Sequence, residues 1–391
     1  MLLPLICAVA IGITGLGTVI PVLPFFAVSL GAQEDLAALI FSAFSAAALL
    51  SGPFWGRLSD RIGRKPVLLA SISMTILSYI WMASVTQLWE LYACRILAGL
   101  SAGWMAVGYA YVADVTPPEK RAGMMGMLGA AFGAGFTIGP GLGAWSVGAA
   151  QTDYSLPPLI AAGCYGIAAL LVLLLLKEPA RTRTDTGQTG PQLALLRSRY
   201  LLMLLALYLC VFLMFTGLDG TFALWGKLRF GLGPRDIGLL LTLAGVTLIL
   251  VQSNVGRIIR VFGEMRVVTG AIFLMSGVFI LMTLLPSPAF IFLLPILYAV
   301  SSALFNPAMQ SLISRTVPAD RQGSVMGLSQ STMSLARILG PAWAGFLLAH
   351  GGPSLPFLTG AAILLPIGLA AIPVILRARR FILARETAGE D

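Results

Sequence analysis

Long apolar runs separated by short polar segments recur along the whole chain. Many of these runs contain about 20 residues, the length of helix that crosses about 30 Å of hydrocarbon. They predict membrane-spanning helices at residues 2–29, 36–55, 66–85, 88–113, 122–148, 156–176, 200–225, 236–256, 267–285, 288–313, 323–349 and 355–376. A barrel does not fit, because its strands need only about 10 residues each and alternate apolar with polar positions. The pattern predicts an all-α membrane protein with about twelve spanning helices.

The polar segments repeat within the chain, which indicates two homologous halves. At an offset of 256 − 56 = 200 residues, the recurring pairs are Gly56 with Gly256, Arg57 with Arg257, Gly63 with Gly263, Thr116 with Thr316, Pro118 with Pro318, Arg121 with Arg321 and Gly123 with Gly323. A repeat in the same order is typical of one class of secondary transporters. The predicted organisation is an N-terminal six-helix bundle at residues 1–176, a flexible cytoplasmic linker at 177–199, and a C-terminal six-helix bundle with a short basic cytoplasmic tail at 200–391.

The placement of the basic residues predicts topology. The chain is 58% hydrophobic and 10% charged, with a net charge of +9, whereas soluble domains are about 25% charged. Twenty Lys and Arg residues fall in the terminal and inter-helix segments of one side, and only Lys227, Arg229 and Arg235 fall on the other. The positive-inside rule then places both termini and the linker in the cytoplasm. The excess of basic residues therefore indicates the orientation of the chain in the membrane, and it does not indicate nucleic-acid binding.

One charged block carries a family signature. It fits the pattern GxxxDRxGRK, and its defining residues are Gly56, Asp60, Arg61, Gly63, Arg64 and Lys65. In this motif, in its repeat and in its helix count, the chain resembles the major facilitator superfamily, which implies two six-helix bundles with pseudo-two-fold symmetry. The resemblance also implies a conformational latch, in which Asp60 faces Ser324 and Arg61 pairs with Asp114. A solvated basic loop that only fixes topology is the alternative.

A second motif lies in the predicted fifth helix. It consists of Gly126, Gly135, Gly139, Pro140 and Gly143, and it is similar to the motif of the superfamily's drug and proton antiporters. Small residues at helical spacing allow helices to approach closely, so packing alone could also explain them. The full spacing favours an exporter over an importer.

Arg95, Asp219 and Arg337 are charged residues that lie deep inside predicted spans, away from their ends. Arg95 resembles the fourth-helix arginine implicated in proton coupling in the family, and structural pairing with carbonyl groups of the first helix is the alternative. An arginine at the centre of a span costs about 2.5–3.5 kcal/mol, so it should face a partner or a wet cavity. Asp219, in the seventh helix, is the candidate proton carrier. A static ion pair between Asp219 and Arg337 is the competing hypothesis.

The chain also resembles the tetracycline-exporter branch around residues 21–24 and 66–69. The acidic residues that this branch carries in its first and third helices fall at Gly12 and Ser78 here. Tetracycline is therefore doubtful as a substrate.

Polar and aromatic residues at other positions are candidates for a substrate cavity. They are Thr14, Tyr109, Phe132, Phe136, Phe215, Asn306 and Gln310. Few charges among aromatic rings suit a lipophilic or amphiphilic solute better than a sugar, which demands many hydrogen-bonding side chains.

These observations predict a secondary active transporter that works by alternating access, with proton-coupled efflux of a small lipophilic or amphiphilic compound. The alternatives are a uniporter or symporter of a small metabolite and, from another class, a membrane sensor or membrane enzyme. No catalytic cluster, cofactor motif or metal-ligand spacing is visible in the sequence. We expect a lipid-embedded monomer in the inner membrane of a bacterium.

Overall fold

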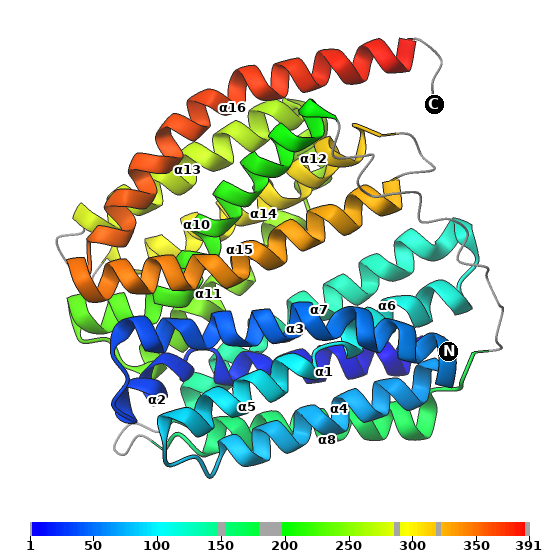
Figure 1. Ribbon diagram of the computed structural model, residues 1–391, viewed down its shortest axis with the longest axis vertical. Coiled ribbons are helices and arrows are strands. Elements are labelled where there is room, and N and C mark those ends of the chain that lie inside the picture. Colours follow the sequence, from blue (N-terminus) through cyan, green and yellow to red (C-terminus); the bar gives the residue numbers. More distant parts are fainter. Residues whose placement is uncertain (1, 148–152, 180–197, 285–289, 318–321, 388–391) are drawn as a thin grey trace. The chain divides into compact units, whose positions relative to one another are not determined.

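The computed structural model of the chain describes residues 2–147, 153–179, 198–284, 290–317 and 322–387 (Figure 1). These residues form helices and short turns and contain no strand. Twelve of the helical segments are long and apolar enough to span a membrane. Helices are expected there because a chain in hydrocarbon must satisfy every backbone polar group within itself. The predicted all-α fold with twelve spans is confirmed.

Eight helices form the first six spans. They are α1 (Leu3–Val19), α2 (Leu23–Ser29), α3 (Glu34–Ile62), α4 (Arg64–Met82), α5 (Leu88–Leu100), α6 (Trp104–Val115), α7 (Pro118–Ser146) and α8 (Leu156–Leu175). The first predicted span is divided near Pro21 into α1 and α2, because proline has no backbone N–H to donate. The fourth predicted span is divided by a turn at residues 101–103 into α5 and α6. Both divisions lie inside runs that hydropathy alone joins.

The second half contains seven described helices, of which six are spans and α12 is a short connecting helix. They are α10 (Arg199–Phe230), α11 (Pro234–Gln252), α12 (Val255–Phe262), α13 (Glu264–Leu284), α14 (Leu293–Ser314), α15 (Gln322–Gly351) and α16 (Leu355–Thr387). The predicted last span ended at residue 376, but α16 continues to Thr387. The basic tail is therefore helical over its described part.

The charged block at residues 56–65 is helical, which corrects its description as a loop. Helix α3 continues through the block to Ile62, and α4 begins at Arg64. Gly63 alone interrupts them, with φ of 111°, a backbone conformation that glycine adopts without a steric penalty. Gly263 separates α12 from α13 in the same way, with φ of 79°. Gly63 and Gly263, which are equivalent positions of the sequence repeat, thus each separate two helices by a single residue.

The helices group into two compact units. The first comprises residues 1–183 together with Gly220–Gly245, and in it α1 packs against α7 and α8. The second comprises residues 184–219 together with Val246–Asp391, and in it α13 packs against α14 and α16. Most of the predicted linker, at residues 180–197, lies outside the described residues. The predicted domain boundaries stay a prediction.

Candidate functional site

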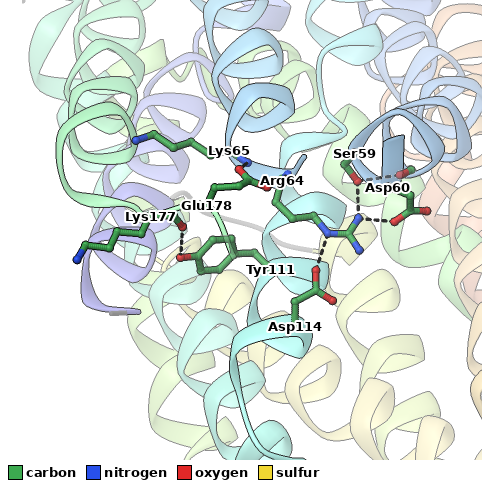
Figure 2. A network of polar contacts seen from close by, with 9 residues as sticks. Ser59, Asp60, Arg64, Lys65, Tyr111, Asp114, Lys177 and Glu178 are labelled. Carbon is green, nitrogen blue, oxygen red and sulfur yellow. Dashed lines mark hydrogen bonds and ion pairs between the residues drawn. The ribbon is translucent and has the colours of Figure 1, made fainter. Parts of the chain in front are cut away.

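Arg64 is the centre of the polar network in the charged block (Figure 2). Its Nε atom lies 2.7 Å from Oδ2 of Asp114, at the end of α6, and its Nη1 atom lies 2.6 Å from Oδ1 of Asp60, on α3. The same Nη1 donates a hydrogen bond of 2.5 Å to Oγ of Ser59. One guanidinium therefore joins the ends of α3 and α6 to the start of α4, using the fixed fork of donors that arginine provides.

Asp114 forms an ion pair with Arg64, which the sequence had not predicted. Arg61 was the expected partner, but the guanidinium that contacts Asp114 is that of Arg64. The reason is the position of the helix break: Arg61 belongs to the last turn of α3, whereas Arg64 opens α4 immediately after Gly63. The expected approach of Asp60 to Ser324 joins residues of different units and stays a prediction.

Glu178 completes this network and was missed by the sequence analysis. Its carboxylate accepts hydrogen bonds from the backbone N–H groups of Arg64, at 2.6 Å, and Lys65, at 2.8 Å. The first N–H groups of a helix have no partner inside the helix, so Glu178 caps α4. Lys65 Nζ donates to the carbonyl oxygen of Leu173, near the end of α8, at 2.8 Å. Figure 2 shows the carboxylate of Glu178, in the segment that follows α8, beside the start of α4. The only sequence signal is an acidic residue directly after an apolar run.

The glycines of the fifth-span motif lie against α1. A Cβ atom added at Gly139 would lie 2.6 Å from Cα of Gly17, and one at Gly135 would lie 2.9 Å from the backbone nitrogen of Thr14. A Cβ at Gly143 would meet the backbone of Thr18, 3.0 Å from its Cα. Gly126 has no atom within 4 Å of the same position. Three of the four glycines are therefore required by close helix packing, which is the first of the two roles considered for this motif.

The second half repeats this crossing. A Cβ at Gly340, on α15, would lie 2.8 Å from the backbone nitrogen of Gly217 and 2.6 Å from the carbonyl oxygen of Leu213, both on α10. Oγ1 of Thr216 donates to the carbonyl oxygen of Ala336 across the same pair of helices, at 2.8 Å. Gly17 and Gly217 are 217 − 17 = 200 residues apart. The sequence contained this pair, but only the structure shows that Gly17 meets Gly139 and that Gly217 meets Gly340.

Asp219 lies within the span formed by α10, and its partner comes from α14. The hydroxyl of Tyr298 donates a hydrogen bond of 2.5 Å to Oδ1 of Asp219. Arg337 is close enough to act on Asp219 electrostatically, but no ion pair joins the two among the described residues. Both charged side chains are exposed, although burial was expected. Nothing in the sequence pointed to Tyr298 as the partner of this carboxylate.

An aromatic face of α10 leads to Asp219. Tyr208, Phe212 and Phe215 precede it at helical spacings of 4, 3 and 4 residues, so all four side chains share one face. The ring of Phe215 is only 2% exposed and packs on the ring of Tyr298, with centroids 5.7 Å apart. The buried ring of Phe215 therefore packs against the ring of Tyr298 and restricts its movement. This spacing is a signal that could have drawn attention to Tyr208.

Asn306 and Gln310, both predicted as cavity residues, are brought together with Tyr208. The hydroxyl of Tyr208 donates to Oδ1 of Asn306 at 2.6 Å. Nε2 of Gln310 lies 3.3 Å from the same oxygen and 3.4 Å from the Tyr208 hydroxyl. The second unit thus contains a polar cluster at one end of the aromatic face of α10 and Asp219 at the other.

Arg95 is buried in the first unit, with 2% of its surface exposed. Its guanidinium carbon lies 4.4 Å from the centroid of the Phe44 ring, a cation–π contact. Tyr79 and Tyr165 interact with it electrostatically. Among the described residues its Nε atom has no hydrogen-bond partner and its side chain has no ion pair. A partner or a wet cavity was expected beside Arg95; the Phe44 ring is a partner, and both the coupling role and the pairing with carbonyl groups of the first helix stay predictions.

The other predicted cavity residues lie in the first unit. Thr14 donates from Oγ1 to the carbonyl oxygen of Ala10 at 2.8 Å. The rings of Phe132 and Phe136 are stacked, with centroids 6.0 Å apart and an interplanar angle of 9°. Phe132 and Tyr109 are each 36% exposed. These two residues present aromatic surface that a lipophilic compound could contact.

The two positions without the expected acids are closely surrounded by other groups. A Cβ at Gly12 would lie 3.2 Å from the Trp104 indole and 3.3 Å from the Tyr165 ring. Ser78 is fully buried and donates to the carbonyl oxygen of Cys94 at 2.7 Å. Aromatic rings and helix backbone thus occupy the space around these positions.

Comparison with known proteins identifies many relatives along the full chain. A family model described as the Major Facilitator Superfamily matches residues 5–341 and 207–390. Tetracycline resistance protein, class C, of Escherichia coli is 32% identical over 377 residues, covering 93% of this chain and 94% of that protein. Multidrug resistance protein 2 of Bacillus subtilis (strain 168) is 30% identical over 364 residues, covering 88% of this chain and 87% of that protein.

Solved structures of transporters are also similar to this chain. The human organic anion transporter MFSD10 (TETRAN) matches with a TM-score of 0.69 and 25% identity, covering 94% of this chain and 98% of its own. The nucleoside transporter NupG matches with a TM-score of 0.80 and 14% identity, covering 95% of this chain and 98% of its own. At that identity the second likeness shows the fold alone.

Proposed function

The chain belongs to the Major Facilitator Superfamily and is a membrane transporter, and from this premise we propose that it exports a small lipophilic or amphiphilic compound in exchange for protons. The observation that carries the proposal is the Asp219 carboxylate, which accepts the hydrogen bond of Tyr298 inside a span and is exposed. A carboxylate in a membrane span is costly and is retained where it serves transport. The resistance proteins among the relatives support export as the direction.

In this proposal Asp219 takes up a proton from the outside and releases it to the inside as the solute leaves. The ionised carboxylate is stabilised by the hydroxyl of Tyr298 and by the nearby charge of Arg337. Uptake of a proton removes the negative charge with which the Tyr298 hydroxyl and Arg337 interact. Both side chains can then change their contacts. The proton thereby alters packing between α10 and α14, the helices that carry Asp219 and Tyr298.

The solute that we propose is amphiphilic and is not a tetracycline. In the first unit, the rings of Tyr109 and Phe132 present exposed aromatic surface, and in the second, Tyr208 and Asn306 form a polar cluster. Gly12 and Ser78 stand where the tetracycline-exporter branch carries its acids, and this difference is the support for a solute other than a tetracycline.

We further propose a bacterial inner-membrane protein with both termini in the cytoplasm, functioning as a monomer in contact with lipid. Twenty of the Lys and Arg residues fall on the proposed cytoplasmic side, against three on the other, and this asymmetry is the support for the orientation. The network around Arg64 then lies on the cytoplasmic side, where we assign it the role of the conformational latch. The alternatives of a membrane sensor or membrane enzyme gain no support from relatives that are transporters.

The experiment is a transport assay with the purified full-length chain in proteoliposomes. A panel of lipophilic cations, neutral amphiphiles, tetracyclines and sugars is tested with and without an imposed pH gradient, and proton movement is followed by a pH-sensitive dye. We expect at least one amphiphile to be accumulated against its gradient and to drive opposite proton movement. A solute that is transported with no dependence on the pH gradient would establish the uniporter instead. Transport of none would contradict the proposal.

A further inference from the structure

A cavity opens in the second unit at the point where α12 meets α13. Its volume is about 570 Å³, within the range of about 300–1,000 Å³ typical of small-molecule sites. Its lining residues are Ile259, Arg260, Val261, Phe262, Gly263, Glu264, Met265, Arg266, Leu312, Arg315 and Ile375. None of these residues belongs to the proposed proton site or to the Arg64 network.

The charged part of the lining is cationic. Three arginines and one glutamate give it a net charge of 3 − 1 = +2. Glu264 is already engaged, since Oγ of Ser311 donates to its Oε1 at 2.5 Å and Nη1 of Arg315 lies 3.4 Å from its Oε2. Arg260 and Arg266 are exposed and form no ion pair with any described residue. Two guanidinium groups therefore flank the cavity with positive charge that the described side chains do not neutralise.

The remaining part of the lining is apolar and lies at the level where spans end. Span α11 ends at Gln252, α13 begins at Glu264, and α14 ends at Ser314. Helix α12 connects α11 to α13 and has no buried residue. Its exposed Phe262 (57%) and Val261 (68%) would be unfavourable in water.

The sequence of α12 is that of an interfacial helix. Val255, Ile258, Ile259 and Phe262 recur at helical spacing and share one face, while Arg257 and Arg260 lie elsewhere on the helix. Such a helix lies in the membrane surface, with its apolar face among acyl chains and its basic residues near anionic headgroups. The cavity thus offers guanidinium groups for a phosphate beside apolar residues for a chain.

We propose that this cavity binds an anionic phospholipid, with its phosphodiester held between Arg260 and Arg266. The apolar residues of α12 and Leu312 contact the upper part of the acyl chains. Arginine provides paired donors that match two phosphate oxygens, and juxtamembrane basic residues attract anionic lipid. The site takes lipid from the leaflet on the arginine-rich side of the membrane. It is independent of the proton site, so either proposal can fail alone.

The test uses the purified full-length chain in a neutral detergent, with bound lipid counted by native mass spectrometry. Phosphatidylglycerol is titrated against phosphatidylcholine with the same chains, and glycerol 3-phosphate is the soluble competitor. We expect retention of phosphatidylglycerol over phosphatidylcholine and no displacement by glycerol 3-phosphate. Arg260→Gln and Arg266→Gln should each weaken phosphatidylglycerol binding roughly fivefold, the effect of about 1 kcal/mol per basic residue.

Arg257→Gln is the matched control, because it removes the same charge one turn earlier on α12 from a residue that does not line the cavity. It should weaken binding less than twofold. An equal loss in all three variants would mean diffuse charge attraction and would overturn the site. Equal binding of phosphatidylcholine would also overturn it. Displacement by glycerol 3-phosphate would make the cavity a site for free phosphate esters and would overturn the lipid assignment.

Discussion

The crossing of α1 and α7 at Gly17 and Gly139 makes a sharp prediction for Gly139→Ala. The added Cβ would lie 2.6 Å from Cα of Gly17 and 2.9 Å from its carbonyl carbon. Ordinary contact between carbon atoms is about 3.5–4.0 Å, so the helices must separate by about 1 Å. Both opposing atoms belong to backbone, so no side-chain rotation can relieve the contact.

The magnitude follows from two opposing effects. Overpacking of this kind costs about 1–3 kcal/mol, whereas replacing glycine by alanine inside a helix gains up to about 1 kcal/mol. We expect a net loss of about 1–2 kcal/mol for Gly139→Ala. Gly126→Ala is the control, since it lies on the same helix and in the same motif but has nothing within 4 Å of its Cβ position. That variant should be as stable as the natural chain or more stable.

The assay is thermal unfolding of the purified chain in detergent, followed by the fluorescence of its seven tryptophans. Because unfolding of such proteins is commonly irreversible, apparent midpoints are compared at one scan rate. The midpoint of Gly139→Ala should fall by several degrees, and that of Gly126→Ala should not fall. Equal midpoints for the natural chain and Gly139→Ala would refute the close crossing. An equal fall in both variants would show that the motif is sensitive as a whole and would refute the assignment to backbone contact.

The latch and the proton site make further predictions. Arg64→Gln should lower stability by about 1–2 kcal/mol in the same unfolding assay, since it removes both ion pairs of a partly buried group. Arg57→Gln is the control and should have little effect, because Arg57 is an exposed arginine of the same helical block. Glu178→Gln keeps one acceptor for the start of α4 but loses the charge, so it should cost less than Glu178→Ala, for which we expect about 1 kcal/mol. The same unfolding assay measures both; no loss of stability in Glu178→Ala would contradict the cap, and no loss in Glu178→Gln would contradict a contribution from its charge. Tyr298→Phe removes the donor to Asp219 while keeping the ring, so it should shift the pH dependence of transport in proteoliposomes without loss of folded protein, and an unchanged pH profile would contradict the pairing.

The spans could be predicted from the sequence because hydrocarbon imposes a single requirement on the backbone. The ends of helices within polar segments could not be predicted, since they depend on single residues. The charged block looked like a loop by composition, yet α3 continues through it to Ile62 and only Gly63 breaks the helix. The break at Gly63 places Arg64 at the start of α4, where its guanidinium pairs with Asp114. The family motif located the network correctly but not its contacts.

The candidate proton site illustrates the same limit. Asp219 was identifiable because an acid inside an apolar run is rare and costly. Its partner Tyr298 is 79 residues away in the sequence, and no local pattern relates the two. The spacing of Tyr208, Phe212 and Phe215 before Asp219 defines a helix face, but which helix covers that face is a tertiary fact. Glu178 was equally hidden, because the N–H groups that it caps are more than 100 residues earlier.

The role of Asp219 is tested most directly by comparing two kinds of transport in Asp219→Asn. Proteoliposomes containing this variant, the natural chain or Asp236→Asn, an acid in the first turn of α11, are assayed for solute exchange at equal pH and for accumulation driven by a pH gradient. Asparagine keeps the size of the side chain and an acceptor for Tyr298 but cannot carry the proton. We predict that Asp219→Asn retains exchange and loses gradient-driven accumulation, whereas Asp236→Asn retains both. Full gradient-driven accumulation by Asp219→Asn would contradict the account.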